Sequence, residues 1–487
     1  MPGLTFKQRG KGKRQLRAAP LLAALLLLPL VVSGCKYTAA PADLLQKPTI
    51  AEGKQQLTSA IARALPKHSL LTLPLRDDDY KEAVRLIDLD GDGVDEAVVT
   101  YYGEYSTPEI MLLRNENNSW RKWLTIQQPL ARGIDWLKLT DFDNDGQQEL
   151  LVGWIGSYDS PNTLELYSFQ TKVTRNDTGE KTLEPLESFS YTLAEVGEFG
   201  NDGITQLAIL LSYDSKGDDM LSSHDLDVYE WRGNGMKRIT SMELTPSVNS
   251  YDTMVIGEIS PRHRGIIIEG NTGAHSMMTY MYAWENGKLK PIYPDGPLFM
   301  SEEGFNGRGV YSEDVNGDGI LELHRALQAP GSEQASYVDT EWINQYVQWD
   351  GRTGYEVVTE QYQNYAYGIR LTIPKEWRGR YTFSPLENEP YGLVSFQYWD
   401  ERDKASTELA ALYAIRLEKW SELEESWQNK AKQKPYFELS RDSGNVFVVQ
   451  YAKAPPVQLA EAAQADFMDM VKAVERFPSL LQFEHNQ

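Results

Sequence analysis

The chain has 487 residues, more than one ordinary domain contains, so two or three domains are expected. Hydrophobic residues make up 41% of it and aromatic residues 11%, which is ample for folded cores and excludes a disordered chain. Its 70 acidic and 48 basic side chains leave a net charge of −22, which argues against nucleic acid and anionic lipid surfaces as direct partners and favours cation binding.

Residues 1–34 have the layout of a secretory signal peptide: basic residues, then a long apolar stretch, then small residues. The segment "VVSGC" ends in Cys35, the only cysteine of the chain, and resembles the bacterial lipobox. That resemblance implies cleavage before Cys35 and acylation of its thiol. The mature protein would then be extracytoplasmic, anchored by lipid to the cell membrane of a bacterium without spanning it. An uncleaved N-terminal anchor is the alternative.

Residues 35–70 are predicted to be a tether with one accessory helix. Thr49 and Glu52 form a capping-box pattern, apolar residues follow at helical spacing, and Pro66 ends the pattern. No chemistry is expected in this segment.

A short acidic loop then occurs three times, as "DLDGDGVDEAVV" from Asp88, "DFDNDGQQELLVGW" from Asp141 and "DVNGDGILELHRA" from Asp314. Each copy has a side-chain oxygen at positions 1, 3 and 5, glycine at position 6 and glutamate at position 9. Calcium takes roughly six to eight hard oxygen ligands, and this spacing lets one tight loop supply most of them, including the carbonyl of position 7. The predicted ligands of up to three Ca²⁺ ions are Asp88, Asp90, Asp92, Val94, Glu96, Asp141, Asp143, Asp145, Gln147, Glu149, Asp314, Asn316, Asp318, Ile320 and Glu322.

Two other interpretations of these loops were possible. Solvated turns without metal are one, because Asp-Gly is also ordinary turn chemistry, but three copies in the same register favour calcium. EF-hands are excluded, because they need a glutamate at position 12 and flanking helices. Position 12 holds Val99, Val152 and Arg325, and strand-like segments follow each loop.

The loop spacing also predicts the architecture. Asp88 and Asp141 are 53 residues apart, and Asp314 follows Asp141 by 173, about three such intervals. Two degenerate copies lie between them, near Glu198 and Glu258, and the second has Ser260 and Arg262 where acids should be. A period of about 50 residues with roughly four strands per unit is typical of a β-propeller.

These units resemble FG-GAP/VCBS repeats, the calcium-loop blades of integrin alpha-chain propellers, over about residues 75–360. The resemblance implies a mainly β fold, with a propeller of about five blades across residues 71–362. The segment "LLTLPL" at 70–75 is a candidate for the strand that closes the ring with the last blade.

Residues 363–487 lack acidic loops and are predicted to form a small α+β domain that folds independently. One helical pattern carries Trp420, Leu423 and Trp427, and another carries Phe467, Val471, Val474 and Phe477. The "IPKEW" opening resembles that of PsbP-like domains appended to exported proteins. No function follows from that resemblance.

The sequence contains no serine-hydrolase elbow, no H-E-x-x-H motif and no phosphate-binding glycine loop, and its six histidines lack metal-ligand spacing. We therefore expect a protein that is not an enzyme: a lipid-anchored envelope protein whose calcium-stabilised propeller binds an envelope protein or a glycan, and no nucleic acid. One alternative is an exported polysaccharide-active enzyme on a propeller scaffold, with paired carboxylates on one rim. The other is a sensory lipoprotein that partners a membrane protein.

Overall fold

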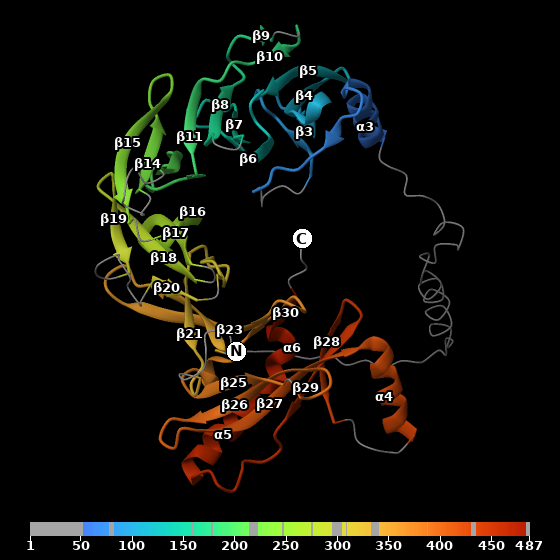
Figure 1. Ribbon diagram of the computed structural model, residues 1–487, viewed down its shortest axis with the longest axis vertical. Coiled ribbons are helices and arrows are strands. Elements are labelled where there is room, and N and C mark those ends of the chain that lie inside the picture. The colour runs from blue at the N-terminus through green and yellow to red at the C-terminus, as the bar shows by residue number, and fades with distance from the viewer. Residues whose placement is uncertain are drawn as a thin grey trace, which may run out of the picture. The chain divides into compact units, whose positions relative to one another are not determined.

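A computed structural model describes most of the chain after residue 51 (Figure 1). The described residues are 52–76, 82–157, 160–176, 179–213, 223–245, 248–273, 276–294, 304–307, 309–332, 340–386, 388–429 and 435–483. The predicted signal peptide and Cys35 lie outside them. Within these ranges, no helix combines the length and the apolar character that crossing a membrane requires.

The chain divides into two units, Met1–Ala64 and Leu65–Gln487. In the first unit, the described residues form helix α3 (Glu52–Ala64), at the place where the capping pattern predicts a helix. The helix ends just before Pro66, whose ring cannot continue it.

In the described part of the second unit, five antiparallel sheets follow one another, one for each sequence repeat. The first consists of β1 (Leu70–Leu71), β2 (Val84–Ile87), β3 (Glu96–Tyr102), β4 (Pro108–Glu116) and β5 (Ser119–Gln127). The second consists of β6 (Gly133–Thr140), β7 (Glu149–Ile155), β8 (Asn162–Ser168) and β11 (Glu187–Tyr191), and the third of β12 (Leu193–Gly197), β13 (Gln206–Tyr213), β14 (Ser223–Trp231) and β15 (Met236–Leu244).

The fourth sheet consists of β16 (Ser250–Ser260), β17 (His263–Gly273), β18 (Ser276–Glu285), β19 (Lys288–Tyr293) and β20 (Phe305–Asn306). The fifth consists of β21 (Leu323–Gln328), β22 (Trp342–Trp349), β23 (Tyr355–Asn364), β24 (Ile369–Thr372) and β30 (Leu481–Phe483). A separate hairpin pairs β9 (Thr174–Arg175) with β10 (Lys181–Thr182). The mainly β repeat fold predicted from the sequence is confirmed.

The inner sheets are apolar on both faces because each packs between two neighbours. In β7, Leu150 and Val152 belong to the core shared with the first sheet, whereas Leu151 belongs to the core shared with the third. Successive residues of a strand point to opposite faces, so one strand serves both cores. Further cores join the third sheet to the fourth and the fourth to the fifth. This packing explains the continuous apolar runs, such as "ELLVGW", that follow the acidic loops.

Strand β1 differs from its prediction. Leu70 and Leu71 pair with Tyr102 and Tyr101 of β3, inside the first sheet. Further along, the Leu75 N–H donates to the Ile134 carbonyl of the second sheet at 3.0 Å. The segment 70–75 therefore adds to the first two sheets, and the prediction that it pairs with the last repeat is wrong.

The C-terminal part contains a sixth sheet and three helices. Its strands are β25 (Tyr381–Pro385), β26 (Gly392–Asp400), β27 (Ala405–Arg416), β28 (Phe437–Asp442) and β29 (Asn445–Tyr451). Its helices are α4 (Leu417–Asn429), α5 (Glu461–Ala473) and α6 (Phe477–Leu480). Both predicted helical patterns lie on these helices or just after α5, and Trp420, Phe467 and Phe477 are buried.

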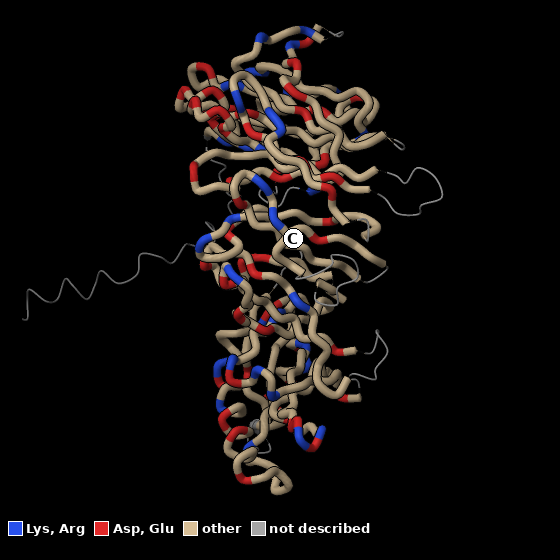
Figure 2. Tube along the Cα trace, turned by 90° about the vertical axis from the view of Figure 1, so that its left-hand side faces the viewer, with Lys and Arg blue, Asp and Glu red and all other residues tan. Residues whose placement is uncertain are grey.

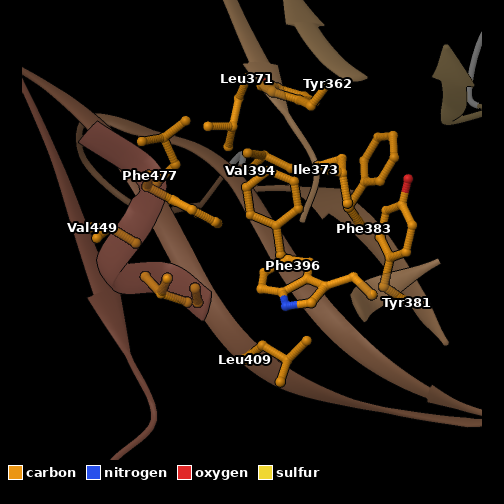
Figure 3. Packing of buried hydrophobic residues seen from close by; sticks show 14 of the residues in the cluster. Tyr362, Leu371, Ile373, Tyr381, Phe383, Val394, Phe396, Leu409, Val449 and Phe477 are labelled. Carbon is orange, nitrogen blue, oxygen red and sulfur yellow. The ribbon is translucent and has the colours of Figure 1, made fainter. Parts of the chain in front are cut away.

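The structure differs from the predicted domain boundary at residues 362 and 363, which falls inside β23. The fifth sheet continues from β23 into β24 and then into β30, which comes from the end of the chain. Tyr362 and Leu371 of this sheet pack in one core with Phe396 of the sixth sheet and with Phe477 (Figure 3). The fifth repeat and the C-terminal part therefore share a sheet and a core.

Candidate metal centre

The three acidic loops occupy corresponding places, because the glutamate at position 9 is the first residue of the following strand or stands immediately before it. Loop 1 (88–96) joins β2 to β3, loop 2 (141–149) joins β6 to β7, and loop 5 (314–322) leads directly into β21. Their acidic residues are among the red segments of Figure 2. The sequence period therefore places each cluster of acids at the same end of its sheet.

The aspartate at position 1 organises each loop through the backbone. In loop 1, Asp88 accepts hydrogen bonds from the N–H groups of Gly91 at 2.9 Å and Gly93 at 2.8 Å. Asp141 accepts from the Gly146 N–H at 2.9 Å, and Asp314 from the Gly319 N–H at 2.8 Å. These bonds close the turn with carboxylates still gathered inside it.

Position 6 of each loop requires glycine. Its φ angle is +83° in Gly93, +90° in Gly146 and +87° in Gly319, in the left-handed region that side chains with a Cβ rarely adopt. The invariant Asp-Gly pair of the three loops is therefore explained by backbone geometry as well as by ligand chemistry.

The glutamate at position 9 is buried and closes the loop on its other side. Glu96 accepts the Leu89 N–H at 3.0 Å, Glu149 the Phe142 N–H at 3.0 Å, and Glu322 the Val315 N–H at 2.9 Å. Each donor is the residue at position 2, which is apolar in all three loops. These position 2 residues were missed by the sequence analysis, although the sequence shows the pattern.

Burial raises the pKa of each of these three glutamates to about 7. The backbone N–H of position 2 opposes that rise, and the neighbouring aspartates add to it by repulsion. In the absence of a bound metal ion, burial therefore disfavours the ionised form of each glutamate, whereas the hydrogen bond from position 2 favours it.

Each loop brings three acidic side chains together. One carboxylate oxygen from each member lies within 4.8 Å of the others in the groups Asp88, Asp90 and Glu96; Asp141, Asp143 and Glu149; and Asp314, Asp318 and Glu322. In loop 1 the Oδ1 atom of Asp90 is buried and has no hydrogen-bond partner among the described residues. An all-oxygen cluster with such an atom suits a hard cation such as calcium.

The remaining predicted ligands have other contacts. Asp92 and Asp145 lie outside the three groups, and each accepts the N–H of the residue two positions on, at 2.8 Å. Asn316 donates its amide N–H to Asp318 at 3.0 Å. The ligand roles of these residues, and of the carbonyls of Val94, Gln147 and Ile320, stay predictions.

The two degenerate loops show that the turn can form without the full set of acids. In loop 3 (198–206) Gln206 replaces the glutamate and accepts the Phe199 N–H at 2.9 Å, so the closing bond survives without the charge. Loop 4, after Glu258, is a tight turn in which Ser260 and His263 hydrogen-bond at 2.9 Å. Calcium is not expected at loop 4.

Polar side chains reach into the loops from the strand that pairs with the loop's own strand, or from the turn just after it, and the sequence analysis missed them. In loop 1 Arg114 forms an ion pair with Asp90. In loop 2 Gln170 donates to Asp145, and in loop 5 Gln348 donates to Asp318 and Glu322, at 3.1 Å each. These residues follow their loops by about twenty residues or more, and no local signal in the sequence identifies them.

Loops 1 and 2 also contact each other. The Gln148 N–H donates to the Leu89 carbonyl at 3.4 Å. A Cβ added to Gly91 would lie 3.2 Å from the Gly146 carbonyl oxygen, so the two turns approach closely.

Comparison with known proteins supports the repeat family over part of the chain. The FG-GAP-like repeat family matches residues 88–152, which begin at loop 1 and end in β7. The chain matches no curated protein. It is similar to the solved structure titled "Crystal structure of exotype rhamnogalacturonan lyase YesX", with 12% identity and a TM-score of 0.24, over 70% of this chain and 74% of that chain.

The expectation that the protein is not an enzyme is corrected by this comparison. It was based on the absence of catalytic motifs, whereas one of the solved structures to which the chain is similar is titled as a lyase. Missing sequence motifs do not exclude catalysis, because catalytic side chains can come from different strands. The similarity does not carry the activity of that enzyme over to this chain.

We predict that Glu149→Gln stabilises the metal-free protein more at about pH 8 than at about pH 5. The usual carboxyl pKa is 4.5 and the folded value is about 7, so the protonated form contributes stability fully below 4.5. That contribution is lost as the pH rises through 7. Glutamine stays neutral throughout, and Gln206 makes the same bond in loop 3.

Thermal unfolding of both proteins in chelator across this pH range measures the difference. Glu116→Gln, at an exposed position of β4, is the control and should show no such trend. A Glu149→Gln effect that is the same at both ends of the range would contradict the prediction.

Proposed function

We propose that the protein is a calcium-binding repeat scaffold of the cell envelope, in which bound calcium stiffens the loop ends of the sheets and the opposite ends bind a ligand. The observation that carries this proposal is the threefold recurrence of one oxygen cluster at one place in the fold. Calcium in these loops would neutralise the crowded carboxylates and bridge the two strands that each loop joins.

We also propose that the chain is anchored by lipid on Cys35. Support comes from the order of basic, apolar and small residues before the only cysteine. About thirty residues then separate the anchor from the first sheet, which is enough for the scaffold to stand away from the membrane surface.

A second candidate function is action on polysaccharides. Exposed tyrosines lie at or after the ends of strands that run away from the loops: Tyr105 after β3, Tyr213 at the end of β13, and Tyr365 and Tyr367 between β23 and β24. Tyr105, between β3 and β4, is 90% exposed. A tyrosine offers an apolar ring face and a hydroxyl together, which suits a sugar ring with its apolar face and its hydroxyl groups.

Calcium at millimolar concentration should raise the melting temperature, and chelation should lower it. A hundredfold excess over the dissociation constant stabilises by about 2.7 kcal/mol per site. Asp90→Ala, Asp143→Ala and Asp318→Ala should each remove one of up to three sites, because each deletes a ligand from a different loop. Calorimetric titration counts the sites.

Ser260→Ala in loop 4 is the control for these variants, and its calcium response should equal that of the unmodified protein. Identical melting in calcium and in chelator would refute the calcium-binding proposal.

Cys35→Ser should release the protein from the membrane or leave it unprocessed, because serine has no thiol to acylate. Fractionation and mass measurement of the mature N-terminus report the result. A serine variant that matures normally and still partitions with lipid would be incompatible with the anchoring proposal.

Tyr105→Ala should weaken binding to an immobilised polysaccharide by about tenfold, the effect of losing one well-placed aromatic contact. A panel of neutral and acidic polysaccharides supplies the ligands, and the release of new chain ends with time separates catalysis from binding. Exposed Leu130, changed to alanine, is the control. Neither binding nor new chain ends with any polysaccharide would remove this candidate.

A further inference from the structure

Loop 1 differs from the other two calcium-type loops because a cation of the protein itself already lies in it. Arg114 of β4 forms an ion pair with Asp90 through its NH2 group, and its Nε lies 3.7 Å from Glu96. The guanidinium also lies over the ring of Trp123, 3.5 Å from its centroid, which fixes its position. Arg114 therefore contacts two of the three acids that are grouped in this loop.

The strand register shows that Arg114 occupies a defined position in the repeat. Ala97 pairs with Leu113, so Arg114 is the residue across from Glu96. In the second sheet the residue across from Glu149 is Ser168, and in the fifth the pairing of Leu323 with Val347 puts Gln348 across from Glu322. One position of the repeat thus holds arginine, serine and glutamine in the three loops.

The contacts of the other two loops are neutral. Gln170 and Gln348 supply amide donors to loops 2 and 5. Among the described residues, no lysine or arginine forms an ion pair with an acidic side chain of either loop. Loop 1 alone of the three therefore has its charge partly neutralised from within.

We propose that Arg114 is a built-in competitor for the cation of loop 1 and sets the calcium affinity of that loop below the affinities of loops 2 and 5. This inference rests on the proposed calcium binding. A calcium ion needs the oxygens of Asp90 and Glu96, which the guanidinium engages, and the two cations repel each other at contact distance. Calcium that binds at loop 1 through the free Oδ1 atom of Asp90 therefore binds against the charge of Arg114.

The competition follows from the chemistry of arginine. Its guanidinium stays charged over the whole accessible pH range, so it is present at every condition in which the carboxylates are ionised. In calcium-free protein it offsets the repulsion among the acids of loop 1. The same residue thus stabilises the metal-free loop and weakens its metal binding.

The test compares Arg114→Gln with the unmodified mature protein by calorimetric titration with calcium alone. Glutamine reproduces what loop 5 has at this position. The unmodified protein should show two tighter sites and one weaker site, and the variant should tighten the weak site by about tenfold or more, because the competing charge is gone. Adding Asp90→Ala to the variant should abolish that site, which assigns it to loop 1.

Melting temperature gives a second, independent signature. Arg114→Gln should lower it in chelator, since the acids lose their counter-charge, and should raise it in saturating calcium. A residue with a purely structural role would shift it in the same direction under both conditions. If the variant folds only in calcium, Arg114→Lys, which keeps the charge without the planar fork, completes the comparison.

Arg121→Gln is the matched control. Arg121 pairs with Arg114 on the neighbouring strand β5 and is exposed, so the variant changes the net charge equally without touching the loop. Three sites of equal affinity that Arg114→Gln leaves unchanged would overturn this inference while leaving the proposed function intact. No calcium binding in any variant would instead overturn the proposed function.

Discussion

The rest of this fold depends on how a buried side chain at position 9 closes each loop. In four repeats that side chain accepts the N–H of position 2, at 2.9 or 3.0 Å. The acceptor is glutamate three times and glutamine once, so the bond and not the charge completes the turn. The bond places an apolar residue, such as Leu89 or Phe142, in the core below the loop. The negative charge of the glutamate is not needed for this hydrogen bond, and burying that charge is destabilising unless a cation is nearby.

The loop ends of the sheets are also where successive repeats meet. Loop 1 contacts loop 2 through Leu89. Loop 5 contacts the start of loop 4, because the Leu321 N–H donates to the Glu258 carbonyl at 2.7 Å. Between loops 3 and 4, Arg264 donates to the Glu198 carbonyl at 2.7 Å and lies 3.5 Å from the Glu258 carboxylate. An arginine therefore contacts an acid of the degenerate fourth loop, as Arg114 does in loop 1. The calcium-type loops lie in the first, second and fifth repeats. The loops of the third and fourth repeats are joined to each other by contacts of Arg264.

The other constraint is that a sheet with two apolar faces needs a neighbour on each. The inner sheets satisfy it by packing on one another, which is why alternate residues of β7 enter different cores. The fifth sheet satisfies it with the sixth sheet and its helices, around Trp377, Phe396 and Phe477. Trp377 and Phe477 have ring centroids 5.6 Å apart, and the Trp377 Nε1–H donates to the Met470 carbonyl at 2.9 Å. The C-terminal part thus covers the last repeat.

The sequence by itself determined the features whose parts lie close together along the chain. Every element of an acidic loop falls within nine residues, so spacing alone predicted the clustered acids and the repeat period. The helical patterns around Trp420 and Phe467 were readable for the same reason. Tertiary structure decided the pairings between distant segments. It placed Arg114 across from Glu96, joined Leu481–Phe483 to β24 and put β1 beside β3. Such contacts depend on strand register and on which faces remain uncovered, and neither is encoded in a local run of residues.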